Sequence, residues 1–476
     1  MLAVSAAGRG RPAQTWRSTL PMTTVIIGGG ISGLSAAYYL GKRGLPSTIV
    51  ESRSRLGGVI ETGHVEGCTI EGGPDSFLSA KPAALDLIRD LGMSDQVIGS
   101  NDHLRVTFVK KNGRLVPLPD GLMMMVPTKI LPLATTRLLS AGTKIRMGLE
   151  LLRSPKPRGE DESVADFVRA HYGQEAVDYL AEPLLSGIYG GDPATLSVRA
   201  VLPRFVELSE RYGSLTRGVL ALRASAPKTS APLFRTLKGG LGDLVDAIAR
   251  AIAGHATVRT ARCQAIERTS SGYRIRVADD WLEADRIVVA CEAHSAATLI
   301  AGLDARAAEL LGGIGYSSSM TVAVGYNAAD FERPPVGFGF LIPKKERRRL
   351  VACTWVGTKF PNRVPEGRIV ARCFLGGAAD PGVLNETDDA VIEMVTTELR
   401  ETAGVTARPA FTRIARWPRA MAQYPVGHNA RFAELDARVA SLPGIYLAGN
   451  AYQGIGIPDC IRMGRAAAEK IAGVTV

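Results

Sequence analysis

The chain has 476 residues, of which 46% are hydrophobic and 22% are charged. This length and balance predict a globular protein of two or three domains and exclude a disordered chain. Lysines and arginines exceed acidic residues by 11, but aromatic residues make up only 6% of the chain and do not alternate with basic ones. Nucleic acid is therefore not an expected partner, and the positive charge points to an anionic substrate or membrane surface.

The cysteines and the hydropathy of the chain indicate in which cellular compartment the protein is expected. The spacing of the cysteines predicts neither a zinc site nor a redox pair, and it fits a reducing, cytoplasmic environment. The six are Cys68, Cys263, Cys291, Cys353, Cys373 and Cys460. The longest uncharged window, residues 310–329, is broken by glycines and serines, so no transmembrane helix is expected.

Residues 1–21 carry three arginines and no acidic residue. They lack the apolar stretch of a secretory signal, so two interpretations are open: a targeting peptide, or an overlong start before Met22. In either case we expect a disordered leader that adds nothing to the first strand.

A glycine-rich segment opens the first structural unit. The run Thr23–Ile27 predicts a strand, Gly28-Gly29-Gly30-Ile31-Ser32-Gly33 follows it, and a helix is expected over Leu34–Leu40. Glu51 ends the next apolar run, residues 48–50. This is the pattern of a dinucleotide-binding βαβ unit, in which glycines admit a pyrophosphate to the helix N-terminus and the acid accepts ribose hydroxyls.

A second glycine pair, Gly57-Gly58, comes shortly after the acid. Paired glycines let a second loop cross a cofactor without collision of Cβ atoms, and Arg55 offers a positive charge near the phosphates. Domains that bind only NAD do not need this pair, whereas it resembles the glycine doublet of FAD-dependent amine oxidases and desaturases. FAD is therefore the expected cofactor.

The remaining patterns predict an α/β fold with three kinds of region. Residues 91–215 are expected to form a helical domain, 216–233 a linker, and 301–419 a substrate-binding domain with a mixed sheet. A large pocket is expected at the seam between domains. The Rossmann-type FAD-binding domain is expected to be discontinuous and to comprise residues 22–90, 234–300 and 420–476.

Residues 129–158 hold seven lysines and arginines and one acid, Glu150, with leucines at helical spacing. Two interpretations are open for this stretch. It is either a solvated basic helix packed on the protein, or a face that contacts a membrane as part of a peripheral protein.

The C-terminal segment carries the second signal for a cofactor site. Residues 444–450 predict a strand and a turn, and Ile455-Gly456-Ile457-Pro458-Asp459 opens a helix that runs to Ile471. The N-terminus of that helix would stabilise negative charge on a reduced flavin.

Three further segments carry a resemblance that covers the chain from Met22 onward. They are Gly72-Gly73-Pro74-Asp75-Ser76-Phe77-Leu78, Glu182-Pro183-Leu184-Leu185-Ser186-Gly187-Ile188-Tyr189-Gly190-Gly191-Asp192 and Gly456-Ile457-Pro458-Asp459-Cys460-Ile461. Together they resemble the flavin-dependent porphyrinogen oxidases of haem biosynthesis, within the amine oxidase superfamily. The resemblance implies repeated hydride transfer from methylene bridges of a porphyrinogen to flavin N5, with loss of a pyrrole proton. Oxygen would reoxidise the flavin and yield hydrogen peroxide, with no catalytic side chain and no metal.

The same resemblance implies which residues bind FAD, without a covalent bond. Besides the two glycine segments, Arg55 and Glu51, it implies Ser52, Gly73, Pro74, Asp75, Ser76, Cys263, Trp417, Gly449, Asn450, Ile455, Gly456 and Ile457. Cys263 stands where the family has a valine whose backbone touches adenine, and Asn450 stands where many FAD enzymes have an acid. We expect FAD binding to survive both departures.

Three residues are implied for the substrate. Gly187 resembles a glycine whose backbone faces a pyrrole N–H. Lys81 matches a lysine near propionates in soluble bacterial members, and Arg105 lies within about one residue of an arginine with that role elsewhere in the family. The alternative for both cations is a solvated surface position.

The sequence leaves several alternatives open. Protoporphyrinogen IX and coproporphyrinogen III are both candidate substrates, and a homodimer is one candidate assembly. A flavin amine oxidase or carotenoid desaturase would share both ends of the chain. A non-enzymatic FAD-binding protein would show no flavin reduction by a porphyrinogen.

Overall fold

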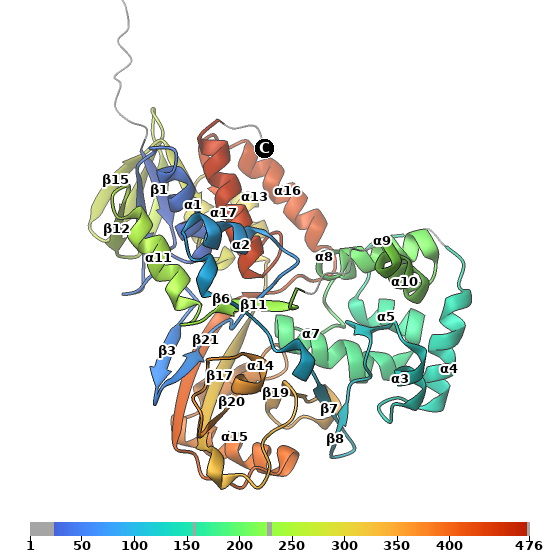
Figure 1. Cartoon of the computed structure of the whole chain (residues 1–476). Coiled ribbons are helices and arrows are strands. Elements are labelled where there is room, and N and C mark those ends of the chain that lie inside the picture. The colour runs from blue at the N-terminus through green and yellow to red at the C-terminus, as the bar shows by residue number, and fades with distance from the viewer. Residues whose placement is uncertain (1–22, 156–158, 226–230, 474–476) are drawn as a thin grey trace, which may run out of the picture.

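The computed structural model describes residues 23–155, 159–225 and 231–473. Two regions are built around β-sheets and one is built mainly of helices, and the three meet at the centre of the molecule (Figure 1). The leader predicted for residues 1–21 lies outside the described residues. Within the described ranges, no helix is both long and apolar enough to cross a bilayer.

A parallel sheet forms the centre of the first region, with the strand order β12-β2-β1-β16-β22. Its strands are β1 (Thr24–Ile27), β2 (Ser47–Glu51), β12 (Ala256–Thr260), β16 (Arg286–Val289) and β22 (Ile445–Leu447). The central strand β1 is buried along its whole length, as expected for a parallel sheet covered on both faces. This confirms the predicted α/β class with a Rossmann-type unit.

Helices from both ends of the chain pack together over this sheet. Every residue of α1 (Ile31–Gly41) is buried, and α1 lies against α17 (Ile457–Ile471). The contact depends on a small residue, because a Cβ on Gly464 would lie 2.2 Å from the carbonyl oxygen of Ser32. The region also contains α2 (Ala83–Asp90), α11 (Gly242–Ile252), α12 (Ala293–Ile300), α13 (Ala305–Gly312), α16 (His428–Ala440), β13 (Cys263–Arg268), β14 (Tyr273–Val277) and β15 (Asp280–Ala284).

The second region is a seven-stranded sheet with the order β21-β17-β20-β19-β18-β7-β8. All neighbours are antiparallel except β18 and β7, which are parallel. Val391, Val395 and Leu399 of α15 (Asp388–Ala403) belong to its hydrophobic core. The strands are β7 (Thr107–Lys111), β8 (Arg114–Pro117), β17 (Tyr316–Asn327), β18 (Gly339–Leu341), β19 (Leu350–Trp355), β20 (Arg368–Gly376) and β21 (Phe411–Ala422), and α14 (Val356–Lys359) follows β19.

The structure differs from the helical domain predicted over residues 91–215. Residues 97–127 contain short strands and a 3-10 turn in place of longer helices, and β7 and β8 make a hairpin that extends the seven-stranded sheet. The turn at Asn112-Gly113 has positive φ at both residues, the conformation that an Asn-Gly hairpin turn favours. This local signal was overlooked, and the pairing of β7 with the distant β18 has no local signal at all.

The helical region begins at residue 130 and continues into the predicted linker. Helix α10 (Leu215–Ser225) takes up the first part of the predicted linker. It forms there because Leu215 and Val219 pack into the core. The other helices are α3 (Ile130–Thr135), α4 (Ala141–Leu149), α5 (Val164–Tyr172), α6 (Gln174–Ala176), α7 (Glu182–Tyr189), α8 (Val198–Val201) and α9 (Pro203–Tyr212). A π-helical segment, residues 177–181, lies between α6 and α7.

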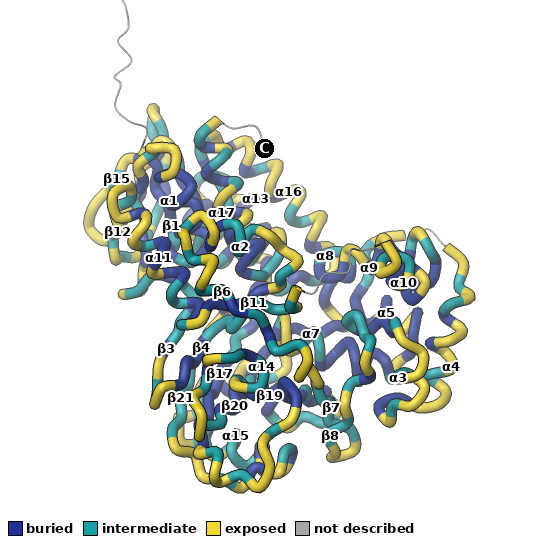
Figure 2. The backbone as a smooth tube through the Cα atoms, in the orientation of Figure 1, coloured by how far each residue is buried: buried dark blue, intermediate teal, exposed yellow. Residues whose placement is uncertain are grey.

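Small sheets join the regions. They are β3 (Thr62–Val65) with β4 (Cys68–Glu71), β11 (Phe234–Leu237) between β5 (Phe77–Leu78) and β6 (Val97–Gly99), and β9 (Leu122–Met123) with β10 (Val126–Pro127). Helix α13, predicted within the substrate-binding domain, packs instead on α12 and α16 of the first region. Buried segments run through the centres of all three regions (Figure 2).

Candidate active site

A cavity of about 2330 Å³ lies where the three regions meet. Its wall includes the first glycine segment, the 73–76 loop, helix α7, strands of the seven-stranded sheet and the start of α17. Of the predicted site residues, those on the wall are Gly28, Gly30, Ile31, Ser32, Glu51, Ser52, Gly57, Gly58, Gly73, Pro74, Asp75, Ser76, Lys81, Arg105, Gly187, Cys263, Trp417, Gly449, Asn450, Ile455, Gly456 and Ile457.

The N-terminus of α1 opens onto this cavity. Its N-cap, Gly30, has no side chain to bond the first turn, and that turn contains no acidic residue. The second glycine loop approaches closely, since Gly57 N–H donates to Gly29 O at 2.8 Å and a Cβ on Gly58 would lie 3.1 Å from Gly30 Cα. We call the N-terminus of α1 together with this loop the glycine corner. Its unbonded N–H groups and the helix dipole make it suitable for a phosphate group.

Glu51 is held beside this corner. Its carboxylate accepts Gly29 N–H at 2.7 Å and Arg53 N–H at 2.8 Å, and the residue is buried on the cavity wall. These backbone bonds leave lone pairs on the two oxygens for further donors. The carboxylate is therefore suited to bind the hydroxyls of a ribose.

Three predicted residues do not lie on the wall, and each has another contact. A Cβ on Gly33 would lie 2.0 Å from Gly28 O, so this glycine permits close packing of helix and strand. Gly29 donates its backbone N–H to the Glu51 carboxylate. Arg55 donates to the carbonyls of Gly58 and Ile60 at 2.7 and 2.8 Å, so it shapes the second glycine loop, and Arg53 lines the cavity in its place.

The 72–76 loop is held by the seven-stranded sheet. Gly72 O accepts the Trp417 indole N–H at 2.7 Å and the Thr321 hydroxyl at 2.6 Å. Arg372 donates to the carbonyls of Glu71 and Gly73. This loop is therefore positioned by three strands of a different region of the molecule.

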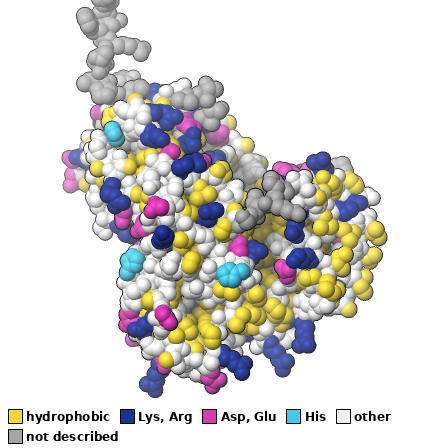
Figure 3. Space-filling model, viewed as in Figure 1, with side chains coloured by type: hydrophobic (Ala, Val, Ile, Leu, Met, Phe, Trp, Pro, Cys, Tyr) yellow, Lys and Arg dark blue, Asp and Glu magenta, His cyan; other side chains and the backbone are white. Residues whose placement is uncertain are grey.

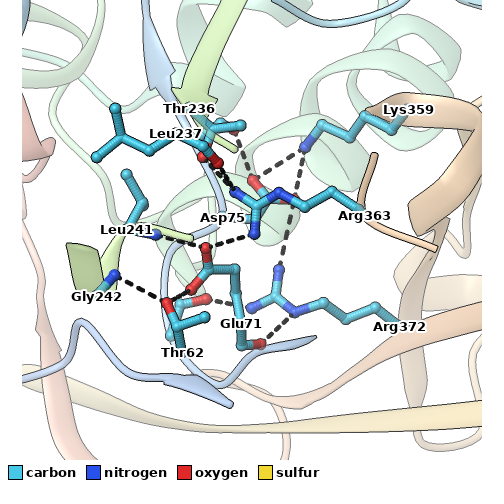
Figure 4. A network of polar contacts seen from close by, with 12 residues as sticks. Thr62, Glu71, Asp75, Thr236, Leu237, Leu241, Gly242, Lys359, Arg363 and Arg372 are labelled. Carbon is cyan, nitrogen blue, oxygen red and sulfur yellow. Dashed lines mark hydrogen bonds and ion pairs between the residues drawn. The ribbon is translucent and has the colours of Figure 1, made fainter. Parts of the chain in front are cut away.

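Asp75 is a partly buried carboxylate within the same loop (Figure 4). Lys359 donates to its two oxygens at 3.0 and 2.8 Å, and Arg372 lies 3.6 Å away. Burial alone would raise the pKa of the Asp75 carboxyl, but Lys359 and Arg372 outweigh burial and hold this pKa well below its usual range. Asp75 is therefore ionised at neutral pH and is a weak base.

A second buried ion pair extends this network (Figure 4). Arg363, almost fully buried, donates to Glu71 Oε1 at 2.9 Å, to Thr236 Oγ1 at 2.7 Å and to Leu237 O at 2.9 Å. Sequence reasoning missed Arg363, Arg372 and Lys359. No local pattern could have shown them, because Glu71 and Arg363 are 292 residues apart.

The start of α17 lies on the cavity wall as predicted, and Lys81 reaches it. Lys81 Nζ forms an ion pair with Asp459 Oδ2 at 2.5 Å, and Gly456 N–H donates to the same oxygen at 3.3 Å. Lys81 thus faces the cavity already paired, and a substrate carboxylate would share it with Asp459. Asn450 donates its side-chain N–H to Ala420 O at 3.0 Å.

The thiols on the wall are protonated. Burial raises the pKa of Cys263 to about 12 and that of Cys460 to about 11. A protonated thiol is a weak nucleophile. The site therefore contains no activated cysteine at these two positions.

Gly187 faces open space. The nearest atom to a Cβ placed on it would be Leu341 Cδ2, at 3.6 Å. Arg105 is exposed on the wall, and sequence reasoning missed other cations there, among them Lys129 and Arg223. Lys129 pairs with Asp120 at 2.6 Å.

The fold and the cavity define a class: a Rossmann-type dinucleotide-binding protein whose cofactor corner opens toward a second sheet. The chain belongs to the flavin containing amine oxidoreductase family, whose model matches residues 31–472. It is therefore a member of a family of flavin oxidoreductases.

Two relatives and one solved structure illustrate the similarity. Coproporphyrinogen III oxidase of Bacillus subtilis is 34% identical, covering 93% of this chain and 96% of the relative. Protoporphyrinogen oxidase 1, chloroplastic, of Arabidopsis thaliana is 30% identical, covering 93% of this chain and 87% of the relative. The crystal structure titled "Putative protoporphyrinogen oxidase" from Exiguobacterium sp. 255-15 has a TM-score of 0.84 and 30% sequence identity to this chain. The match covers 94% of this chain and 98% of that one.

Proposed function

We propose that this protein is a flavin-dependent porphyrinogen oxidase of haem biosynthesis, that it binds FAD without a covalent bond, and that its substrate is coproporphyrinogen III. The observation that carries the proposal is the cavity. Its lining includes a glycine corner with a buried acid, and also Gly187 and the cations Arg105, Lys129 and Arg223. The relatives support the same substrate class.

The residues present fit FAD. The uncapped start of α1 suits a pyrophosphate, Glu51 suits a ribose, and the start of α17 suits the polar edge of an isoalloxazine ring. Protonated Cys460 agrees with a non-covalent cofactor. When bound, the flavin would supply hydride acceptance and electron transfer to oxygen.

The chain's own contribution is binding and orientation. Gly187 offers a wall without a side chain, against which a flat macrocycle can lie. Arg105, Lys129 and Arg223 offer positive charge to carboxylates on the same cavity. A substrate with four propionates uses such cations more fully than one with two, which favours coproporphyrinogen III over protoporphyrinogen IX.

The test compares both porphyrinogens. The chain starting at Met22 is purified, its flavin spectrum is recorded, and porphyrin fluorescence is followed in air with each substrate. We expect faster oxidation of coproporphyrinogen III and formation of hydrogen peroxide. Flavin-bound protein that yields porphyrin from neither substrate would refute the proposal in favour of an amine or polyene substrate.

We also propose that the face of α3 and α4 contacts an anionic membrane. On these helices and in the short turn that follows α4, five large apolar side chains are 59–83% exposed: Ile130, Leu131, Ile145, Leu149 and Leu152. Hydrophobic side chains gather on the surface of the helical region (Figure 3). Lys144, Arg146 and Arg153 lie in the same segment, so apolar and basic groups are combined as in interfacial helices.

Vesicle co-sedimentation tests this contact. We expect the protein to bind vesicles of phosphatidylcholine with phosphatidylglycerol, and binding to fall about tenfold in Ile145→Glu/Leu149→Glu. Val336→Glu, a change at another exposed apolar residue in the second region, is the control. Equal sedimentation of the two variants would contradict the proposed face.

A further inference from the structure

We infer that Arg347 is a positioning residue for the substrate, because it clamps helix α7 to the seven-stranded sheet beside Gly187. The inference rests on the proposed function for the identity of the substrate. We call Glu182, Ser186 and Arg347 the α7 clamp. All three line the cavity.

The clamp joins two elements through one guanidinium group. Arg347 donates to Glu182 Oε1 at 2.9 Å and to Ser186 Oγ at 3.2 Å, both on α7. It also donates to Ile342 O, from Nη2 at 2.8 Å and from Nε at 3.1 Å. The backbone N–H of Lys344 completes the contact by donating to Glu182 Oε2 at 2.9 Å.

The contacts fall beside the two residues that shape the wall. Ser186 precedes Gly187, and Ile342 follows Leu341. Gly187 and Leu341 already meet across the boundary between α7 and β18, at the 3.6 Å separation given above. Arg347 therefore fixes the relative position of the glycine face and the sheet.

The pair is buried, unlike its neighbours. The side chains of Arg347 and Glu182 are 7% and 10% exposed. Two other pairs cross the same boundary, Lys344 with Asp192 and Lys345 with Asp178, and both lysines are about half exposed. Exposed ion pairs contribute little to stability. The position of α7 relative to the sheet at this boundary therefore depends mainly on the buried pair of Arg347 and Glu182.

The other end of α7 is also fixed to the second region. Gly190, in the left-handed conformation that ends the helix, accepts Ala378 N–H at 2.7 Å. Tyr189 O accepts the Gln423 side chain at 2.8 Å. With both ends held, the helix presents Gly187 at a fixed distance from the sheet, and a π-helical segment of the kind frequent at functional sites precedes it.

The test uses the flavin-loaded full chain. Arg347→Met leaves a buried carboxylate unpaired, so the double variant Glu182→Gln/Arg347→Met is made beside it to remove both charges. We expect the double variant to raise the KM for coproporphyrinogen III and the Kd for coproporphyrin III, measured by fluorescence, about tenfold, because the wall at Gly187 would no longer be pre-organised for binding. The kcat should change less than about twofold, and the flavin spectrum should not change.

Two further variants complete the design. Arg347→Lys keeps the charge but not the forked contact, and it should restore part of the affinity. Arg348→Met is the control, because Arg348 is 67% exposed and pairs with Glu401 on the surface. Porphyrin binding by the double variant as tight as that of Arg348→Met would overturn the inference. Wild-type protein that binds coproporphyrin III yet oxidises neither porphyrinogen would refute the proposed function alone.

Discussion

At the scale of the residue, the site depends on glycines whose missing side chains leave room either for protein backbone or for the cavity. Gly33 and Gly464 leave room for protein backbone, since a Cβ there would lie about 2 Å from a carbonyl oxygen. Gly187 is different, because its missing side chain leaves open cavity. The distinction separates glycines needed for packing from a glycine that faces the cavity, and only the tertiary structure reveals it.

Gly187→Ala is expected to separate stability from binding. Alanine has the higher helix propensity, so the free energy of unfolding should rise by about 0.5–1 kcal/mol. The added methyl group enters the cavity, so the KM for a porphyrinogen should rise roughly tenfold. Thermal unfolding and steady-state kinetics check both effects.

Gly148→Ala is the matched control for this prediction. Gly148 lies on α4, and nothing is within 4 Å of a Cβ placed there. It should show the gain in stability and no change in KM. A Gly187→Ala variant with unaltered KM would place the substrate elsewhere in the cavity.

At the scale of the element, charged side chains hold the helices to the strands. Glu175 lies on the short helix α6 and accepts hydrogen bonds from three donors. They are Lys111 of β7 at 2.8 Å, and the backbone N–H and hydroxyl of Ser140, the N-cap of α4, at 2.8 and 2.6 Å. Burial raises the pKa of Glu175, but the bonds from Lys111 and Ser140 outweigh burial and lower this pKa to about 2. One carboxylate thus fixes three elements.

Glu175→Gln is expected to destabilise the protein in a pH-dependent manner. The folded pKa lies below that of an exposed glutamate, about 4.3, so the carboxylate stabilises the fold above that pH. Its contribution, about 1 kcal/mol after solvent screening, is lost as the pH falls toward 2. Chemical denaturation of the wild type and the variant at a series of pH values should give free energies of unfolding that converge in acid. A difference in this free energy that does not change with pH would exclude the ionised carboxylate as the cause.

Element prediction succeeded where the pattern was local. The first strand, its glycine turn and helix α1 lie in one short segment, and each was predicted there. The hairpin of β7 and β8 was missed although its Asn112-Gly113 turn is a strong signal. Residues 216–233 were predicted to be a linker, but helix α10 fills them up to Ser225, and only two of its buried residues, Leu215 and Val219, are large and apolar.

At the scale of the whole molecule, buried charges tie the second region to the small sheets and to the 71–73 segment on the cavity wall. Arg363 reaches Glu71 and β11, and Arg372 of the seven-stranded sheet reaches the 71–73 backbone. The cavity lies at this seam, so the contacts that join the regions also shape the site.

Arg363→Met is expected to destabilise the whole molecule. Glu71 would remain buried without its partner, which costs about 3–5 kcal/mol. Arg368→Met is the control, because Arg368 pairs with Glu66 at a more exposed position near the same sheet. Urea unfolding of both variants measures the difference. Similar midpoints would show that the Arg363 contact is not needed to join the regions.

The sequence by itself determined the dinucleotide unit and the class of chemistry. Strand, glycines, helix and acid follow one another within about 30 residues, the span of one βαβ unit. Only the tertiary structure decided that β7 pairs with β18, that Lys81 meets Asp459, and that Arg347 clamps α7. The physical reason is that an ion pair or a strand pairing depends on proximity, and neither a charge nor a β-rich run specifies which distant partner the folded chain brings to it.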